Sequence, residues 1–120
     1  LQSLRGLEGV SHLGSLYVGA NDQLTSLDGL NSLTTVGTVD LTYNDLLTNL
    51  DALASLTVID GDLKIYENAS LASLDGLSSL TTVTGDLKIT ENPSLATADA
   101  EAFAARLDVG GTVYIEDNGP

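Results

Sequence analysis

The feature that most constrains this chain is an internal repeat with a period of 23 to 24 residues. Residues 61–65, with the sequence GDLKI, recur unchanged as residues 85–89, and the nine residues that follow them are also similar. A repeat of this period is typical of proteins in which each copy is one structural unit that buries its apolar face against its neighbours. We therefore expect a solenoid, in which successive repeats stack as the turns of a coil.

Five turns can be aligned on their first leucine, and each turn contains one alternating stretch after a glycine. The first leucines, 23 or 24 residues apart, are Leu1, Leu24, Leu47, Leu71 and Leu95. Alternation of apolar and polar residues predicts a half-buried strand. The apolar pairs are Leu16 and Val18, Val39 and Leu41, Leu63 and Ile65, Leu87 and Ile89, and Val113 and Ile115. The predicted fold is an all-β solenoid in a single domain, residues 1–120, whose turns each add one strand to a parallel sheet.

A glycine precedes every predicted strand. These glycines are Gly14, Gly37, Gly61, Gly85 and Gly111. Glycine adopts backbone conformations that other residues rarely adopt. We expect these positions to be turns that use this freedom.

The last turn departs from the pattern. Residues 98–107 are rich in alanine and have apolar residues at helical spacing, with acidic residues early and Arg106 late, as the helix dipole favours. We predict a short capping helix here, with Thr97 or Asp99 as its N-cap and Phe103 covering the end of the core. The first turn has no such cover, and the chain starts in mid-repeat without Met, so we expect a fragment or a processed form.

An asparagine lies three residues after the second apolar position of every strand. The row consists of Asn21, Asn44, Asn68, Asn92 and Asn118. A side-chain amide has both a donor and an acceptor, so asparagines stacked inside the coil can pair with backbone groups. We interpret the row as structural. Asn68 also begins an N-glycosylation pattern, but it will not be modified if it points inward.

A second row is acidic, and its role has two interpretations. It consists of Arg5, Asp28, Asp51, Asp75 and Asp99. Each aspartate can accept hydrogen bonds from backbone N–H groups of its own turn. Alternatively, the row can hold a divalent cation such as calcium, which prefers oxygen ligands. One carboxylate per turn is sparse for calcium, which favours the first interpretation, and we assign no metal ligands.

The outward face of the predicted sheet is the candidate ligand-binding site. Its residues of interest are Tyr17, Asp40, Lys64, Tyr66, Lys88 and Tyr114. An ordinary solvated sheet explains most of this composition, because tyrosine and threonine favour strands and lysine pairs with aspartate across strands. Exposed tyrosines among polar residues are also typical of recognition surfaces.

Composition excludes several classes of function. There are 17 acidic and 4 basic residues, a formal net charge of −13, which disfavours binding to nucleic acid or to anionic membranes. Cysteine is absent, so there is no disulfide framework or thiolate site. No apolar run is long enough for a transmembrane helix. His12 is the only histidine and has no evident serine and acid partners, so we predict neither an enzyme nor a cofactor.

The repeat Gly-Asp-Leu-Lys-Ile-x-x-Asn-x-Ser-Leu-x-x-Leu-Asp-Gly-Leu-x-x-Leu-Thr-x-Val resembles receptor L domains. These are the leucine-rich, β-helical ligand-binding domains of the insulin and epidermal growth factor receptors, and similar repeats occur in secreted bacterial and fungal cell-wall proteins. The resemblance covers all five turns. It implies a right-handed β-helix, an extracellular location and binding through the large sheet. The cysteines and tryptophan of the receptor members are absent, so a bacterial or fungal type is closer.

Two hypotheses for function follow. The first is a non-enzymatic extracellular recognition or adhesion module that binds a protein or a glycan on the sheet face. The alternative is a structural component of a surface layer or filament, formed by self-association end to end through the uncapped first turn. An enzyme of the polysaccharide-processing type ranks third. The resemblance identifies no ligand and no specific binding residue.

Overall fold

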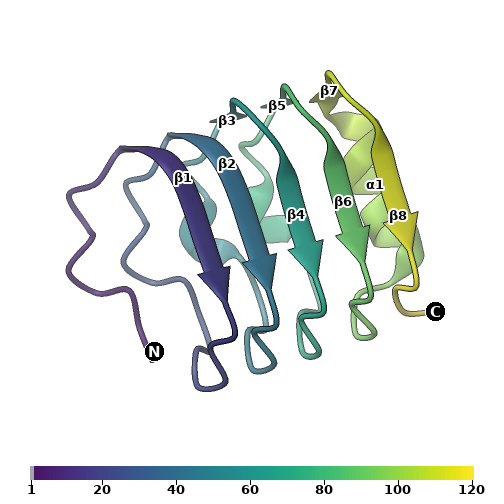
Figure 1. The fold of residues 1–120 in the computed structure, drawn as a ribbon, viewed down its shortest axis with the longest axis horizontal. Helices are drawn as coiled ribbons and strands as arrows, with labels where there is room; N and C mark the ends of the chain where they lie inside the picture. The colour runs from purple at the N-terminus through teal and green to yellow at the C-terminus, as the bar shows by residue number, and fades with distance from the viewer. Residues whose placement is uncertain (1) are drawn as a thin grey trace.

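The computed structural model describes residues 2–120, which form a mostly-β chain with one parallel sheet and one α-helix (Figure 1). Leu1, the first leucine of the predicted first turn, lies outside the described residues. The long strands are β1 (His12–Gly19), β2 (Thr35–Thr42), β4 (Leu63–Tyr66), β6 (Leu87–Thr90) and β8 (Val113–Glu116). The short strands are β3 (Val58–Ile59), β5 (Thr82–Val83) and β7 (Asp108–Val109).

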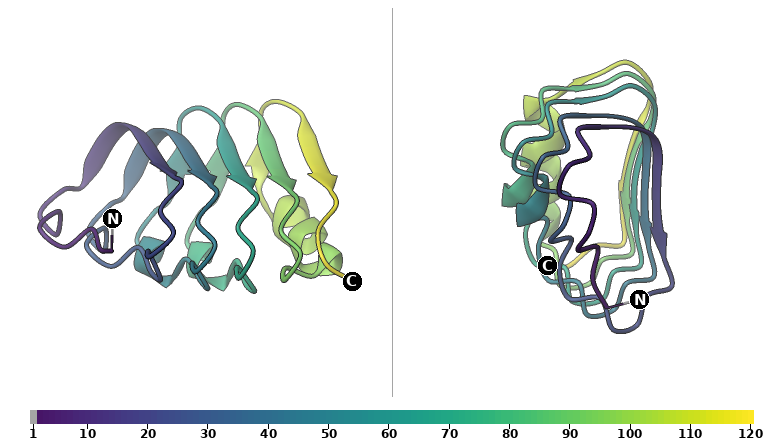
Figure 2. Two further views of the ribbon diagram at one scale, coloured as in Figure 1. Left: turned by 60° about the horizontal axis from the view of Figure 1, so that its bottom comes forward. Right: turned by 90° about the vertical axis from the view of Figure 1, so that its left-hand side faces the viewer.

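The remaining elements lie on the opposite side of the molecule from the long strands. They are the 3-10 turns η1 (Asp51–Leu53) and η2 (Asp75–Leu77) and the helix α1 (Thr97–Arg106). Figure 2 shows the repeats one behind another, with the long strands along one side and these three elements along the other. Leucines from both sides meet between them and form the core.

Neighbouring strands pair at equivalent positions of consecutive repeats. The order is β1, β2, β4, β6 and β8, all parallel. The register pairs Leu41 with Ile65 and Ile65 with Ile89, so each apolar position lies beside its own copy. Leu63, Ile65, Leu87 and Ile89 are each no more than 1% exposed. The predicted parallel sheet is confirmed, and its inner face is buried in β1, β2, β4 and β6, whereas Val113 on β8 is exposed. A closed right-handed coil of five turns stays a prediction.

The change of period from 23 to 24 residues has a structural origin at the corner between the two rows of strands. Val36 pairs with Ile59 and Val39 with Leu63, so β2 spans three steps where the next repeat spans four. The extra residue is a bulge, which bends a strand. Consequently β1 and β2 run through the corner unbroken, and the later repeats divide into a short and a long strand. The sequence pattern did not predict the short strands, because two residues are too few to show alternation.

The glycines before β2, β4, β6 and β8 are required for space rather than for backbone conformation. Among residues 2–120, the glycines with positive φ are Gly6 and Gly29. A Cβ atom at Gly37 would overlap the carbonyl oxygen of Gly14, and one at Gly61 would overlap that of Gly37. The expectation of a special turn conformation at these positions is therefore wrong. Consecutive backbones approach so closely at this corner that a methyl group does not fit.

The asparagine row forms a continuous hydrogen-bonded ladder. Asn44, Asn68 and Asn92 are fully buried, and Asn21 and Asn118 at the two ends are half-buried. The Nδ2 group of Asn68 donates to the carbonyl oxygen of Leu41 (2.9 Å), and its Oδ1 accepts from the backbone N–H of Asn44 (3.1 Å). Because one atom must donate and the other accept, only an amide satisfies both groups. Burial in the ladder also removes Asn68 from the reach of a glycosylating enzyme.

The helix α1 begins at Thr97, and its buried face carries Ala100 and Phe103. The predicted N-cap is wrong, because no side chain caps the first turn. The hydroxyl group of Thr97 instead donates to the carbonyl oxygen of Gly119 (2.8 Å), which the end of the chain brings beside the helix. The helix covers only part of the last repeat, since Val113 on β8 is 42% exposed.

The steric explanation predicts that a glycine-to-alanine substitution at the same position of two repeats, Gly14 and Gly37, changes stability in opposite directions. Gly37→Ala should lower the free energy of unfolding by about 1–3 kcal/mol, because the methyl group overlaps the preceding backbone. The Cβ position of Gly14 has no atom within 4 Å, so Gly14→Ala should stabilise by up to about 1 kcal/mol. Denaturant unfolding of both variants measures the difference. Equal effects would contradict the steric explanation.

The ladder predicts a graded series of asparagine variants. Asn68→Ala should cost about 1–3 kcal/mol for each buried group that loses its partner. Asn68→Asp should cost more, because it replaces a donor by an acceptor and buries a charge. Asn21→Ala, at the half-buried end of the ladder, is the matched control and should cost least. Chemical denaturation checks the order, and a neutral Asn68→Ala would disprove the structural role.

Candidate ligand-binding face

The register places the five residues of the central row side by side across the long strands. Tyr17 pairs with Asp40, Asp40 with Lys64, Lys64 with Lys88, and Lys88 with Tyr114. Tyr17 is 69% exposed and Tyr114 is 41% exposed. The row therefore presents its two ends as accessible aromatic side chains, with two neighbouring ammonium groups between them.

A groove of about 390 Å³ lies over β4, β6 and β8 and brings together four of the six predicted site residues. It is lined by Lys64, Tyr66, Lys88, Thr90, Glu91, Tyr114, Glu116 and Asp117. Tyr17 and Asp40 are outside it, and the carboxylate of Asp40 accepts a hydrogen bond from the hydroxyl group of Thr42. The predicted face thus divides into a groove at the C-terminal strands and a flatter region over β1 and β2.

The lysines of the groove lie over tyrosine rings. The Nζ atom of Lys64 is 5.0 Å from the ring centroid of Tyr66, and that of Lys88 is 5.2 Å from the ring centroid of Tyr114. A cation over the face of an aromatic ring is attracted by the ring's quadrupole. These contacts hold each lysine against a tyrosine, so that both charges lie over aromatic rings in the lining of the groove.

Tyr43 also belongs to this face, although the strand pattern did not predict it. Its ring is 5.4 Å from the ring of Tyr66 at an interplanar angle of 70°, an edge-to-face pair. Tyr43 follows β2, where alternation has ended, but its left-handed backbone (φ 58°) holds it beside the neighbouring repeat. The signal in the sequence is its place immediately before an asparagine of the ladder.

The position before each ladder asparagine forms a row that we call the loop ridge. It consists of Ala20, Tyr43, Glu67, Glu91 and Asp117, all with φ between 50° and 58°. Left-handed backbone is uncommon for residues other than glycine. It recurs in the first four because each of their N–H groups donates to a carbonyl group of the next repeat, as Glu67 does to Thr90 (3.2 Å).

Acidic side chains of the loop ridge lie close enough to perturb one another. The pKa of Glu91 is raised, mainly because its carboxyl group shares a hydrogen bond with Glu67 and further because of partial desolvation and the negative charges of Glu67 and Asp117. The pKa of Tyr66 is also raised, first by a hydrogen bond to Glu67 and then by one to Tyr43. The ridge is therefore an acidic border beside the lysines.

Two further acids of the face serve the sheet itself. One carboxylate oxygen of Asp62 accepts the backbone N–H of Asp86 (2.8 Å), and one of Asp86 accepts the backbone N–H of Thr112 (2.8 Å). These bonds link the starts of neighbouring long strands, next to the bulge. The two aspartates are consequently supports of the corner, outside the groove.

The acidic row on the other side of the molecule is organised in the reverse of the expected way. The backbone N–H groups of Asp51 and Asp75 donate to the side chains two residues earlier, Asn49 (3.0 Å) and Ser73 (3.0 Å). Asp28 and Ser26 form the same pair (3.3 Å). The short polar residue two positions before Asp28, Asp51 and Asp75 thus satisfies the turn, whereas the backbone N–H of Asp99 donates to the carbonyl oxygen of Ala96 (3.0 Å). Within residues 2–120 no group of three or more acidic, histidine or cysteine side chains is arranged to hold a metal ion.

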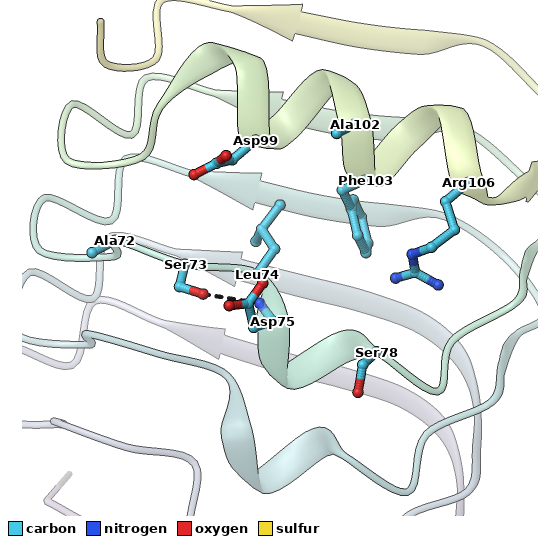
Figure 3. Close-up of a pocket in the computed structure, with 9 residues that line it drawn as sticks. All are labelled: Ala72, Ser73, Leu74, Asp75, Ser78, Asp99, Ala102, Phe103 and Arg106. Atoms are coloured by element: carbon cyan, nitrogen blue, oxygen red, sulfur yellow. Dashed lines mark hydrogen bonds between the residues drawn. The ribbon is translucent and has the colours of Figure 1, made fainter.

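A hollow of about 710 Å³ lies on this side, between η2 and α1 (Figure 3). Arg106 lines one end of the hollow, and its guanidinium group donates to the carbonyl oxygens of Leu80 (2.7 Å) and Leu77 (3.0 Å) while lying over the ring of Phe103. This cation therefore anchors the helix to the preceding repeat.

Comparison with known protein families identifies the chain. The model of the receptor L domain matches residues 35–119, which is more than half of the chain. The chain belongs to the receptor L domain family. Searches of the curated proteins and of the solved structures gave no match. Membership in this family suggests a ligand-binding, non-catalytic module, and receptor L domains occur in extracellular receptors. Within residues 2–120 of this receptor L domain, no helix is long and apolar enough to cross a membrane.

The acidic ridge predicts a stability that falls as pH rises. A carboxyl group whose pKa is raised in the folded state lowers the free energy of unfolding when it is ionised. This loss is absent below the group's ordinary pKa and develops as pH rises through the raised value. Glu91→Gln should therefore raise the melting temperature near pH 7 and leave it unchanged near pH 4. Salt should reduce the gain by screening the neighbouring charges.

The matched control is Glu101→Gln, which removes one exposed charge from the helix α1. Thermal unfolding at both pH values measures the two variants. A gain at neutral pH that is as large for Glu101→Gln as for Glu91→Gln would assign the effect to net charge and exclude the ridge as its cause.

Proposed function

We propose that this receptor L domain is a non-enzymatic extracellular recognition or adhesion module that binds a protein or a glycan through its sheet face. The observation that carries the proposal is the groove, in which Tyr66 and Tyr114 lie beside Lys64 and Lys88 on rigid strands. Tyrosine supplies a large contact area at a low cost in conformational entropy. Side chains on paired strands are held more precisely than side chains on loops.

The proposed scaffold is a right-handed solenoid of five turns that forms a single domain over residues 1–120. Its support is the register, which repeats from β1 to β8, and the asparagine ladder, which runs from Asn21 to Asn118. In such a scaffold every strand is supported by its neighbours. The face can therefore lose a surface side chain without losing its shape.

The proposed binding face leads to a prediction for its exposed tyrosines. Their replacement should change the stability of the protein little but weaken ligand binding strongly. Wild-type protein is first screened against arrays of glycans and of extracellular proteins. For any ligand found, the triple variant Tyr17→Ser, Tyr66→Ser and Tyr114→Ser should weaken binding at least about 100-fold, because aromatic side chains dominate interface energies. Its melting temperature should stay within a few degrees of wild type.

The control is a triple variant on another side of the molecule, Thr34→Ser, Thr57→Ser and Thr81→Ser. These three hydroxyl groups donate to carbonyl groups of the preceding repeat, and serine keeps that hydrogen bond. Binding should be unchanged. If the tyrosine variant binds its ligand normally, the sheet face is excluded as the binding surface. Sedimentation at high concentration would then test the alternative, assembly end to end.

A further inference from the structure

The charges of the groove are separated into two parallel rows. Lys64 and Lys88 are neighbours in the central row, where like charges directly opposite each other are unfavourable. Glu116 lies two residues further along its strand than the central row, and Glu91 and Asp117 lie three residues further, at the loop ridge. All five side chains line the same groove.

The distance between the two rows follows from the geometry of a strand. Each residue of a strand advances the chain by about 3.3 Å, so Glu116 lies about 7 Å from the central row, measured along β8, and Glu91 and Asp117 follow directly after the ends of β6 and β8. The rings of Tyr66 and Tyr114 lie beneath the lysines. The groove therefore has separated charges, with a positive row at the middle of the strands and a negative row at their ends.

This arrangement discriminates against ligands that carry one sign of charge only. A polyanion would meet three carboxylates at the border of the groove, on a chain whose net charge is −13. A polycation would meet the two ammonium groups of the central row. A ligand with one charge of each sign, separated by the distance between the rows, gains from both.

An extended peptide provides that separation. Alternate side chains of an extended chain project to the same side and are about 7 Å apart. We propose that the groove binds an extended peptide segment with an acidic and a basic side chain on alternate residues, the acidic one against Lys64 and Lys88 and the basic one against Glu91, Glu116 and Asp117. The inference rests on the proposed function and names the ligand chemistry of the same face.

The state of the loop ridge supports the placement of the basic side chain. Glu91 and Glu67 lie beside each other, and their mutual repulsion contributes to the raised pKa of Glu91. A guanidinium or ammonium group at Glu91 would offset this repulsion. The two tyrosine rings would then contact the apolar stems of the ligand's side chains, as aromatic residues do at the centres of interfaces.

The test compares four short peptides of one length, each acetylated at its N-terminus and amidated at its C-terminus so that only side chains are charged. They are titrated into isotopically labelled protein and followed by NMR at low ionic strength. The dipolar probe is Ser-Glu-Ser-Arg-Ser. The single-sign probes are Ser-Glu-Ser-Glu-Ser and Ser-Arg-Ser-Arg-Ser. The fourth probe, Ser-Glu-Arg-Ser-Ser, has the same composition as the first but projects its two charges to opposite sides. Signals of β4, β6 and β8 should shift with the first peptide.

The expected result is that the dipolar probe binds about three- to tenfold more tightly than each of the other three, as two exposed ion pairs allow. Lys88→Thr and Glu91→Gln should each reduce this preference. Glu101→Gln, which removes one exposed charge from the helix α1 outside the groove, should leave it unchanged. High salt should abolish the preference, because the charges are exposed.

The outcomes separate this inference from the proposed function. If the dipolar probe binds no more tightly than the other three peptides, the inference is overturned. If a neutral oligosaccharide instead binds and depends on Tyr66 and Tyr114, the sheet face keeps its proposed function and only the ligand chemistry is wrong. If a dipolar preference persists unchanged in Lys88→Thr, the peptide binds elsewhere and the groove is excluded.

Discussion

The constraint on which the rest of the structure depends is the small distance between equivalent backbones in consecutive repeats. Parallel strands lie about 4.8 Å apart. At the corner before β2 and before β4 this spacing leaves no room for a side chain, because a methyl group at Gly37 or Gly61 would overlap the repeat before it. The asparagine ladder depends on the same spacing, because only then does the amide of Asn68 reach the carbonyl group of Leu41. A change in one repeat therefore disturbs both of its neighbours.

The same spacing governs the outer surface. In the core it brings identical aliphatic side chains together, which is favourable. On the sheet face it places Lys64 beside Lys88, and at the loop ridge it places Glu67 beside Glu91, where repeated charges repel. Neutral threonines, as at Thr90, would avoid this cost. This face differs from an ordinary solvated sheet in one feature. Both lysines of the chain lie next to each other, and each lies over a tyrosine ring.

Some features were beyond the reach of sequence patterns for identifiable reasons. Thr97 was expected to cap the helix locally, but the far end of the chain supplies the carbonyl group of Gly119 that takes its hydrogen bond. Tyr43 was outside the predicted face, because its position depends on a left-handed backbone after the strand. The acidic border at Glu91 was likewise not predicted. Each case rests on a contact between repeats, which a pattern within one repeat does not contain.

The sequence by itself determined the period, the parallel sheet, the buried apolar pairs, the helix in the last repeat and the rows of the outward face, including Lys64, Lys88 and Tyr114. These follow from alternation and repetition, which are local properties of the chain. The tertiary structure alone decided that the groove covers the last three long strands, that Tyr17 and Asp40 lie outside it, and that carboxylates of the loop ridge border it. The stacking of the repeats determines which of their side chains meet. The position of a hollow between side chains depends on distances in space rather than along the sequence.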